Sequence, residues 1–136
     1  MVLLVDTNVI LDFILKREPF YDDANAVLTL CSKSDNVGLI ALHSVTNIFY
    51  ILRKMPDELR RRKLSDICCI LEVVGTSHSE VISAIENSAF KDFEDCIQTK
   101  CAKTARADYI ISRNKSDFLL SEVPVLTPQE FIANYH

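Results

Sequence analysis

The chain alternates short, largely apolar runs with amphipathic segments, and this pattern restricts its fold more than any other feature. Runs of four or five such residues suit strands that are buried on both faces, because they lack the polar alternation of a half-exposed strand. Strands and helices that alternate with short connections favour a three-layer α/β/α sandwich with a mostly parallel central sheet. The predicted strands are 2–5 (VLLV), 37–41 (VGLIA), 72–75 (EVVG), 108–111 (DYII) and 123–126 (VPVL).

Capping residues and prolines mark the starts of the helices between these strands. Apolar residues at helical spacing give each helix one buried face. This spacing places Cys68 and Phe93 on the buried faces of their helices. The helices are predicted to start at Thr7 or Asn8, in the turn at Pro19, at His43 or Ser44, at Asp57, at Ser77, at Asp92 and at Thr127–Pro128.

Composition narrows the class of protein further. A chain of 136 residues with 49% hydrophobic content suits a single domain over 1–136 with a substantial core. Its apolar N-terminus is interrupted by Asp6 and Asp12, so we expect neither a secretory signal nor a membrane span, and a soluble cytoplasmic protein. Two glycines exclude a Gly-rich phosphate loop. An odd cysteine count without C-x-x-C predicts buried free thiols at Cys31, Cys68, Cys69, Cys96 and Cys101.

Charge is distributed unevenly along the chain. The net charge is −4, yet residues 53–63 (RKMPDELRRRK) hold six basic residues against two acidic ones. A basic strip on an acidic body suggests one surface for phosphates and another for cations, although a solvated helix face has the same composition. The strip would give a nucleic acid affinity that is independent of sequence. Its basic residues are Arg53, Lys54, Arg60, Arg61, Arg62 and Lys63.

Carboxylates and amides stand where the strands of a parallel sheet would end, which is where sites form in such sheets. Gathered carboxylates repel one another unless a cation holds them, and Mg²⁺ or Mn²⁺ prefers oxygen ligands. The three histidines are dispersed and lack the spacing of zinc ligands. We therefore predict metal-assisted phosphodiester hydrolysis. The candidate residues are Asp6, Asn47, Asp92, Asp95, Asn114 and Asp117.

Each of these residues also has a plain structural explanation. Asp6 and Asp92 are suitable helix caps, and Asn47 beside an apolar stripe could be a buried amide bonded to backbone. Asn114 and Asp117 are ordinary loop residues by composition. The prediction of a site depends on all of them meeting at one end of the sheet.

Three blocks of sequence resemble PIN-domain ribonucleases. VDTNVILDFIL (5–15) resembles the first strand and turn of that family, and SVTNIFYILRK (44–54) its third helix. DFEDCIQTKCAKTARADYIISRNKSDF (92–118) is similar to a later stretch that is common in bacterial members. The resemblance implies an α/β/α sandwich, an acidic Mg²⁺ or Mn²⁺ site, and ribonuclease activity on single-stranded RNA. Many bacterial members are VapC-like toxins with a cognate antitoxin, and the resemblance also suggests a homodimer.

The resemblance assigns roles by position and exposes two departures. Asp6 matches the first acidic ligand, and Asp95 matches the later helix aspartate, with Asp92 as a near alternative. Asn47 stands where many members have glutamate, and Asn114 where many have aspartate. Each amide removes one negative charge, so we expect weaker metal affinity and a single metal ion. Asp117 is the nearby carboxylate that could substitute.

The leading hypothesis is a metal-dependent ribonuclease of the PIN type. Asp6 and Asp95 would bind the ion, with Asp117 close by or acting through water. The other roles fall to Thr7, Asn47 and Asn114, which orient water or the phosphate, and to Arg113, which neutralises a phosphate. Two alternatives remain: a PIN-like module that binds RNA or protein without catalysis, and a phosphohydrolase of small molecules that uses Asp6.

Overall fold

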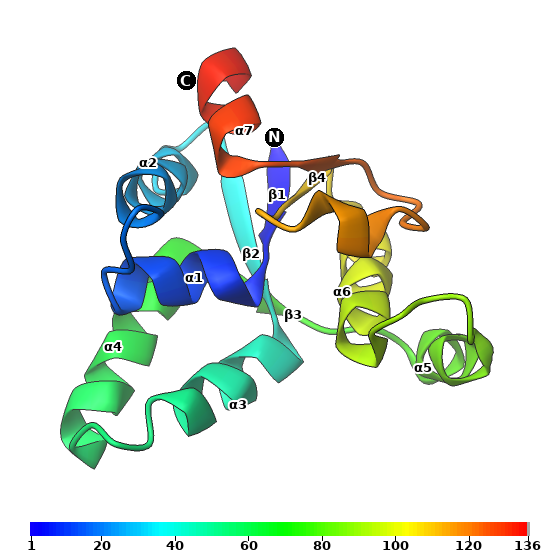
Figure 1. Cartoon of the computed structure of the whole chain (residues 1–136), viewed down its shortest axis with the longest axis horizontal. Helices are drawn as coiled ribbons and strands as arrows, with labels where there is room; N and C mark the ends of the chain where they lie inside the picture. The colour runs from blue at the N-terminus through cyan, green and yellow to red at the C-terminus, as the bar shows by residue number, and fades with distance from the viewer. Residues whose placement is uncertain (136) are drawn as a thin grey trace.

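Five parallel strands form the central sheet in the order β3-β2-β1-β4-β5 (Figure 1). The computed structural model describes residues 1–135. All predicted strands are present, which confirms the expected parallel sheet. The last one is shorter than predicted, since Pro124 has no amide hydrogen for the ladder. The strands are β1 (Val2–Val5), β2 (Val37–Ala41), β3 (Leu71–Val74), β4 (Tyr109–Ile111) and β5 (Val125–Leu126).

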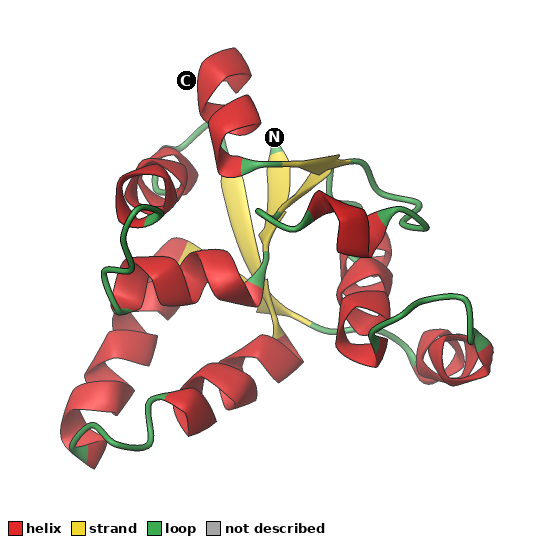
Figure 2. Ribbon diagram, in the orientation of Figure 1, coloured by secondary structure: helices red, strands yellow, loops and turns green. Residues whose placement is uncertain are grey.

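Helices cover both faces of the sheet, as the three-layer prediction requires (Figure 2). One layer packs around Leu3 and Val5, and the other packs α6 against Leu4. These three residues are fully buried, because side chains of the central strand β1 alternate between the two layers. No helix within residues 1–135 is long and apolar enough to cross a membrane. The helices are α1 (Thr7–Ile14), α2 (Tyr21–Cys31), α3 (Leu42–Ile51), α4 (Asp57–Ile70), α5 (His78–Glu86), α6 (Phe93–Thr104), the 3₁₀ turn η1 (Lys115–Phe118) and α7 (Pro128–Tyr135).

The predicted helix caps are present at three positions. The side chain of Ser77 accepts a hydrogen bond from the amide of Glu80 at 3.2 Å. Asp92 accepts one from the amide of Glu94 at 2.8 Å, and Thr127 caps α7 in the same way. Asp6 occupies the N-cap position of α1 but makes no side-chain cap bond. Its carboxylate therefore serves another purpose.

Two helix starts differ from the prediction. α2 begins at Tyr21 rather than at Pro19, because a turn closed by a bond from the amide of Phe20 to the carbonyl of Arg17 precedes the helix. α3 begins at Leu42, directly after β2 and one residue earlier than expected. That short connection places the first turns of α3 at the edge of the sheet where the strands end.

Three residues predicted to be buried are exposed. α4 buries only Leu64 and Ile67, so Cys68 and Cys69 face solvent. Phe93 is 46% exposed because it opens α6 at the edge of the sheet, one turn before the buried part of the helix. All five cysteines are free thiols, and the expectation of burial is confirmed for Cys31, Cys96 and Cys101.

Candidate functional site

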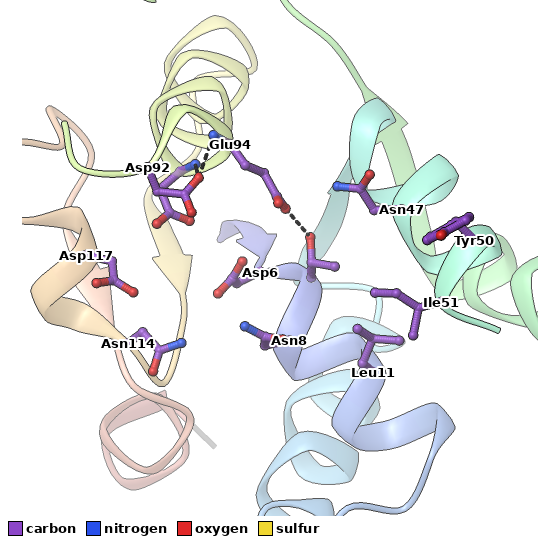
Figure 3. A pocket seen from close by; sticks show the side chains of 12 residues that line it. Asp6, Asn8, Leu11, Asn47, Tyr50, Ile51, Asp92, Glu94, Asn114 and Asp117 are labelled. Carbon is purple, nitrogen blue, oxygen red and sulfur yellow. Dashed lines mark hydrogen bonds between the residues drawn. The ribbon is translucent and has the colours of Figure 1, made fainter. Parts of the chain in front are cut away.

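The predicted site residues meet in one cavity of about 350 Å³ at the carboxyl edge of the sheet (Figure 3). This edge collects segments that follow β1, β2 and β4, because all three strands run in the same direction. Carboxylates at the start of α6 and in η1 lie on one side, and residues of α3 lie on the other. The lining includes Asp6, Thr7, Asn47, Asp92, Asp95, Asn114 and Asp117 from the prediction, together with Asn8, Leu11, Tyr50, Ile51 and Glu94.

Asp6 is held rigidly at the floor of this cavity. It is 5% exposed. Ser112 Oγ donates a hydrogen bond to its Oδ2 at 2.9 Å, and Gln98 Nε2 donates one to its Oδ1 at 2.7 Å. Burial raises the pKa of Asp6 to about 6, outweighing the hydrogen bond from Ser112, which lowers it. The carboxylate is thus oriented but costly to ionise without a cation.

Thr7 links three helices beside Asp6. Its hydroxyl lies 2.7 Å from Ser44 Oγ of α3 and donates to Glu94 Oε1 of α6 at 3.3 Å. Gln98 Nε2 also donates to Thr7 Oγ1 at 3.3 Å. Thr7 is only 6% exposed, so the structure supports a positioning role, and its contact with RNA stays a prediction.

Asp95 carries the largest electrostatic strain at the site. Burial is the main cause that raises its pKa to about 7, followed by repulsion from Asp92, Asp6, Asp117 and Glu94. Within residues 1–135, no lysine or arginine forms a salt bridge with Asp6, Asp92, Asp95 or Asp117. Negative charge on these four aspartates is therefore not neutralised by a direct ion pair, and Arg113 lowers the pKa of Asp6 without a salt bridge to it.

The donor chemistry of the cavity fits a hard divalent cation. Its polar lining offers carboxylate and amide oxygens, which are the ligands that Mg²⁺ and Mn²⁺ prefer. Among the described residues, no group of three or more His, Cys, Asp or Glu side chains is arranged so that it could hold a metal ion. An ion that keeps several of its waters needs only a few direct protein ligands. The carboxylates of the cavity lining that could hold such an ion are those of Asp6, Asp92, Glu94, Asp95 and Asp117.

The raised pKa values predict how stability depends on pH and metal. From the ordinary pKa of 3.8 up to about pH 6 for Asp6 and about pH 7 for Asp95, the folded protein retains a proton on each carboxyl group that the unfolded chain has released. Stability of the metal-free protein is therefore expected to fall from about pH 6.5 to about pH 8. Mg²⁺ binds the ionised carboxylates, so it should raise the melting temperature more at the higher pH.

Thermal unfolding with EDTA or Mg²⁺ at the two pH values measures this effect. The lower pH of 6.5 equals the ordinary pKa of histidine. His43 has a lowered pKa, so below this pH it makes stability rise with pH, whereas Asp6 and Asp95 make stability fall. The Asp95→Asn variant is the control, since it removes the group with the higher pKa and should flatten the slope. A metal-free protein that becomes more stable toward pH 8 would contradict the electrostatics described above.

Arg113 is paired with Asp12 rather than with a carboxylate that lines the cavity, although its positive charge also lowers the pKa of Asp6. Its Nε and Nη2 donate to the two carboxylate oxygens of Asp12 at 2.7 and 3.1 Å, and its guanidinium lies 4.0 Å from the ring centre of Phe20. Asp12 is 1% exposed and Arg113 is half-buried, so this ion pair joins a buried carboxylate to a partly exposed guanidinium. The guanidinium is thus already paired, and its contact with a phosphate stays a prediction. The pair joins α1 to the connection that carries Ser112 and Asn114.

The basic strip divides into two parts. Asp57 pairs with Arg60 at 2.9 Å and with Arg61 at 2.7 Å, and Glu58 lies 3.8 Å from Arg62. The guanidinium carbon of Arg60 also lies 3.6 Å from the ring centre of Phe49, and the residue is half-buried. Its side chain therefore packs on the protein surface and does not extend into solvent. Within residues 1–135, Arg53, Lys54 and Lys63 form no salt bridge with a carboxylate.

Sequence reasoning missed Gln98 and Asp12. Gln98 is fully buried and bonds both Asp6 and Thr7. The available signal was a polar residue between the apolar Cys96 and Cys101 on the face of α6 that packs on the sheet. A charged Asp12 within an apolar helix was the equivalent signal in α1.

Comparison with known proteins identifies relatives over most of the chain. Residues 2–116 match the PIN domain family. The chain is 29% identical to ribonuclease VapC1 of Aquifex aeolicus (strain VF5), covering 97% of this chain and 94% of that protein. Its fold is similar to VapBC2 of Rickettsia felis, solved bound to a promoter DNA fragment, with a TM-score of 0.72, 20% identity and coverage of 93% and 98% of the two chains. VapBC-1 of nontypeable Haemophilus influenzae has a TM-score of 0.72, 14% identity and coverage of 95% and 99%.

The fold and the site together define an α/β/α protein with an acidic cavity at the carboxyl edge of a parallel sheet. Because the family match spans most of its length, the chain belongs to the PIN domain family. The family that the three sequence blocks suggested is thereby confirmed.

Proposed function

We propose that this protein is a metal-dependent endoribonuclease that hydrolyses phosphodiester bonds in single-stranded RNA. The observation that carries the proposal is a cluster of four aspartates at the carboxyl edge of the sheet in a PIN domain protein, none of which has a salt-bridge partner within residues 1–135. These are Asp6, Asp92, Asp95 and Asp117. The relative from Aquifex aeolicus, named as a ribonuclease, supports the same reaction.

Asp6 and Asp95 would hold a Mg²⁺ or Mn²⁺ ion, with Asp117 close by and Asp92 as an alternative. When bound, such an ion lowers the pKa of water and stabilises the negative charge that develops on a phosphate. Asn47 and Asn114 line the same cavity, and their amide groups can donate hydrogen bonds to a phosphate or accept them from water.

Ser112 and Gln98 prepare Asp6 for this task. Each donates a hydrogen bond to a different oxygen of the Asp6 carboxylate, and the two bonds fix the orientation of the carboxylate before any ligand arrives. The backbone amide of Asn114 in turn donates a hydrogen bond to Ser112 Oγ at 3.1 Å, so the connection after β4 is ordered around Asp6. Outer partners of this kind are worth about 10- to 100-fold in metal affinity or activity.

The protein is also proposed to act as the toxin of a toxin–antitoxin pair in the cytoplasm. Its relative is a VapC protein, and the solved structures of similar fold include VapBC assemblies. A cognate antitoxin would then bind this chain, and a homodimer is part of the same proposal. Co-purification with the product of an adjacent small reading frame tests the pairing.

A second candidate is a PIN-like module that binds RNA or protein without catalysis. Asn47 and Asn114 favour it, because they place amides where many family members have acidic residues. Fewer charges hold a cation less firmly. RNA binding by the wild type without any cleavage, together with no detectable Mg²⁺ or Mn²⁺ binding, would select this candidate.

Cleavage of an end-labelled single-stranded RNA across a Mg²⁺ and Mn²⁺ titration decides between the two. We expect wild-type cleavage that rises with metal, little cleavage of a duplex, and a loss of more than about 100-fold in Asp95→Ala. Asp66→Ala removes an exposed aspartate of α4 and should leave the rate unchanged. Equal rates in wild type and Asp95→Ala, or cleavage that persists in EDTA, would contradict the proposal.

A further inference from the structure

An exposed tyrosine lies at the wall of the cavity opposite the carboxylates. Tyr50, in the last turn of α3, is 64% exposed although it lines the same cavity as Asp6 and Asp95 (Figure 3). Ile51, which is 41% exposed, and the buried Leu11 lie beside it on this wall. The cavity therefore has an acidic side and an apolar side, and the metal proposal uses only the acidic one.

Arg53 holds the tyrosine ring in place. Its guanidinium carbon lies 4.3 Å from the ring centre, and its Nη1 donates to the carbonyl oxygen of Tyr50 at 3.3 Å. Because the ring remains mostly exposed, this contact leaves much of its surface open to a ligand. A flat ring backed by a guanidinium is a suitable surface for stacking a nucleobase.

Two cations next to Tyr50 are available for phosphates. Arg53 and Lys54 follow shortly after α3 and form no salt bridge with a carboxylate within residues 1–135. Arg60, Arg61 and Arg62 are instead paired within α4. Lys63, at the far end of the strip, is also without such a salt bridge, so Arg53 and Lys54 are the unpaired cations of the strip that lie nearest to Tyr50 in the chain.

We propose that Tyr50 stacks on a base of the bound RNA next to the cleaved phosphate, and that Arg53 and Lys54 contact the adjoining phosphates. This inference rests on the proposed ribonuclease function and names the residues that select its substrate. It also accounts for a single-strand preference, because bases in a duplex are already stacked on one another. An RNA strand fits better than a protein segment, since a small apolar wall beside unpaired cations suits a base followed by a phosphate rather than a long apolar stripe.

The absence of tryptophan from the sequence makes a direct test available. In Tyr50→Trp, the single tryptophan reports on its own surroundings without background. Fluorescence of this variant in EDTA is expected to change when a single-stranded oligoribonucleotide is added. No change is expected with a duplex or with an abasic oligonucleotide of equal charge. A signal that is equal for abasic and normal strands would overturn the stacking role.

Kinetics of substitutions separate stacking from a merely structural role. Tyr50→Ala is expected to raise KM about tenfold with little change in kcat, and Tyr50→Phe should restore the wild-type KM. Ile85→Ala, at an exposed position of α5, is the matched control. Unchanged KM in Tyr50→Ala would refute the inference even if the wild type cleaves RNA.

Salt dependence tests the two cations. Arg53→Ala should weaken RNA binding and reduce the salt slope by about 1, whereas Lys33→Ala, which removes an exposed cation outside the strip, should change neither. Equal effects of the two substitutions would contradict the role given to Arg53. A fluorescence change in EDTA combined with no cleavage by the wild type would retain the stacking site and reject the nuclease proposal. A response of Tyr50→Trp to a protein partner but not to RNA would assign the surface to that partner and reject the inference.

Discussion

Replacing Asp6 with asparagine is expected to reduce metal-dependent cleavage of single-stranded RNA by more than about 100-fold, because it removes a carboxylate that we propose as a direct ligand of the metal ion. Asparagine has nearly the same shape, but its single side-chain oxygen can accept only one of the two hydrogen bonds that Ser112 and Gln98 donate to Asp6. The loss of a buried, repelled carboxylate removes the cause of the raised pKa. We therefore expect a folded protein that is no less stable than the metal-free wild type at neutral pH.

Two measurements accompany this variant. Initial cleavage rates are compared at saturating Mg²⁺, and thermal unfolding is recorded in EDTA. Asp66→Asn, which changes the same chemical group at an exposed position of α4, should match the wild type in both. An Asp6→Asn enzyme with the wild-type rate would show that this carboxylate is not needed for the reaction.

Removing the guanidinium of Arg113 is expected to destabilise the protein by about 3 kcal/mol. Asp12 is 1% exposed and receives two hydrogen bonds from Arg113, while Arg17 lies farther away at 3.6 Å. The Arg113→Ala variant leaves this buried charge with only the weaker partner. Chemical denaturation measured by circular dichroism gives the change in the free energy of unfolding.

A double-mutant cycle separates the ion pair from the packing of Arg113 on Phe20. Asp12→Asn combined with Arg113→Ala should cost less than the sum of the two single substitutions, because neither charge then remains buried alone. Arg113→Lys keeps the charge but loses the two-pronged geometry, and an intermediate cost is expected. If Arg113→Ala costs no more than the exposed Arg62→Ala, the ion pair contributes nothing to stability.

The sheet and half of the site follow from local sequence. β1 is predictable because VLLV has no polar face to expose, and Asp6 is predictable because it follows that strand. Asp92 is a recognisable cap, and its cap bonds leave Asp95 to face the cavity. Strand direction then brings these residues together without any further information.

Partners that lie far apart in sequence were not predictable from one chain. Gln98 reaches Asp6 across 92 positions, and Arg113 reaches Asp12 across 101. A sequence shows that a polar residue interrupts an apolar face, but it does not show which distant group satisfies it. The division of the basic strip was available from spacing, since Asp57 and Arg61 are four residues apart on a helix.

Isothermal titration of Mn²⁺ into the metal-free protein tests the central claim most directly. The account predicts saturable binding of a single ion to the wild type, with affinity that is lost in Asp6→Asn and in Asp95→Ala but kept in Asp66→Asn. The same binding in the wild type and in Asp6→Asn, or no binding to the wild type at millimolar Mn²⁺, would contradict the claim that these carboxylates hold a divalent cation.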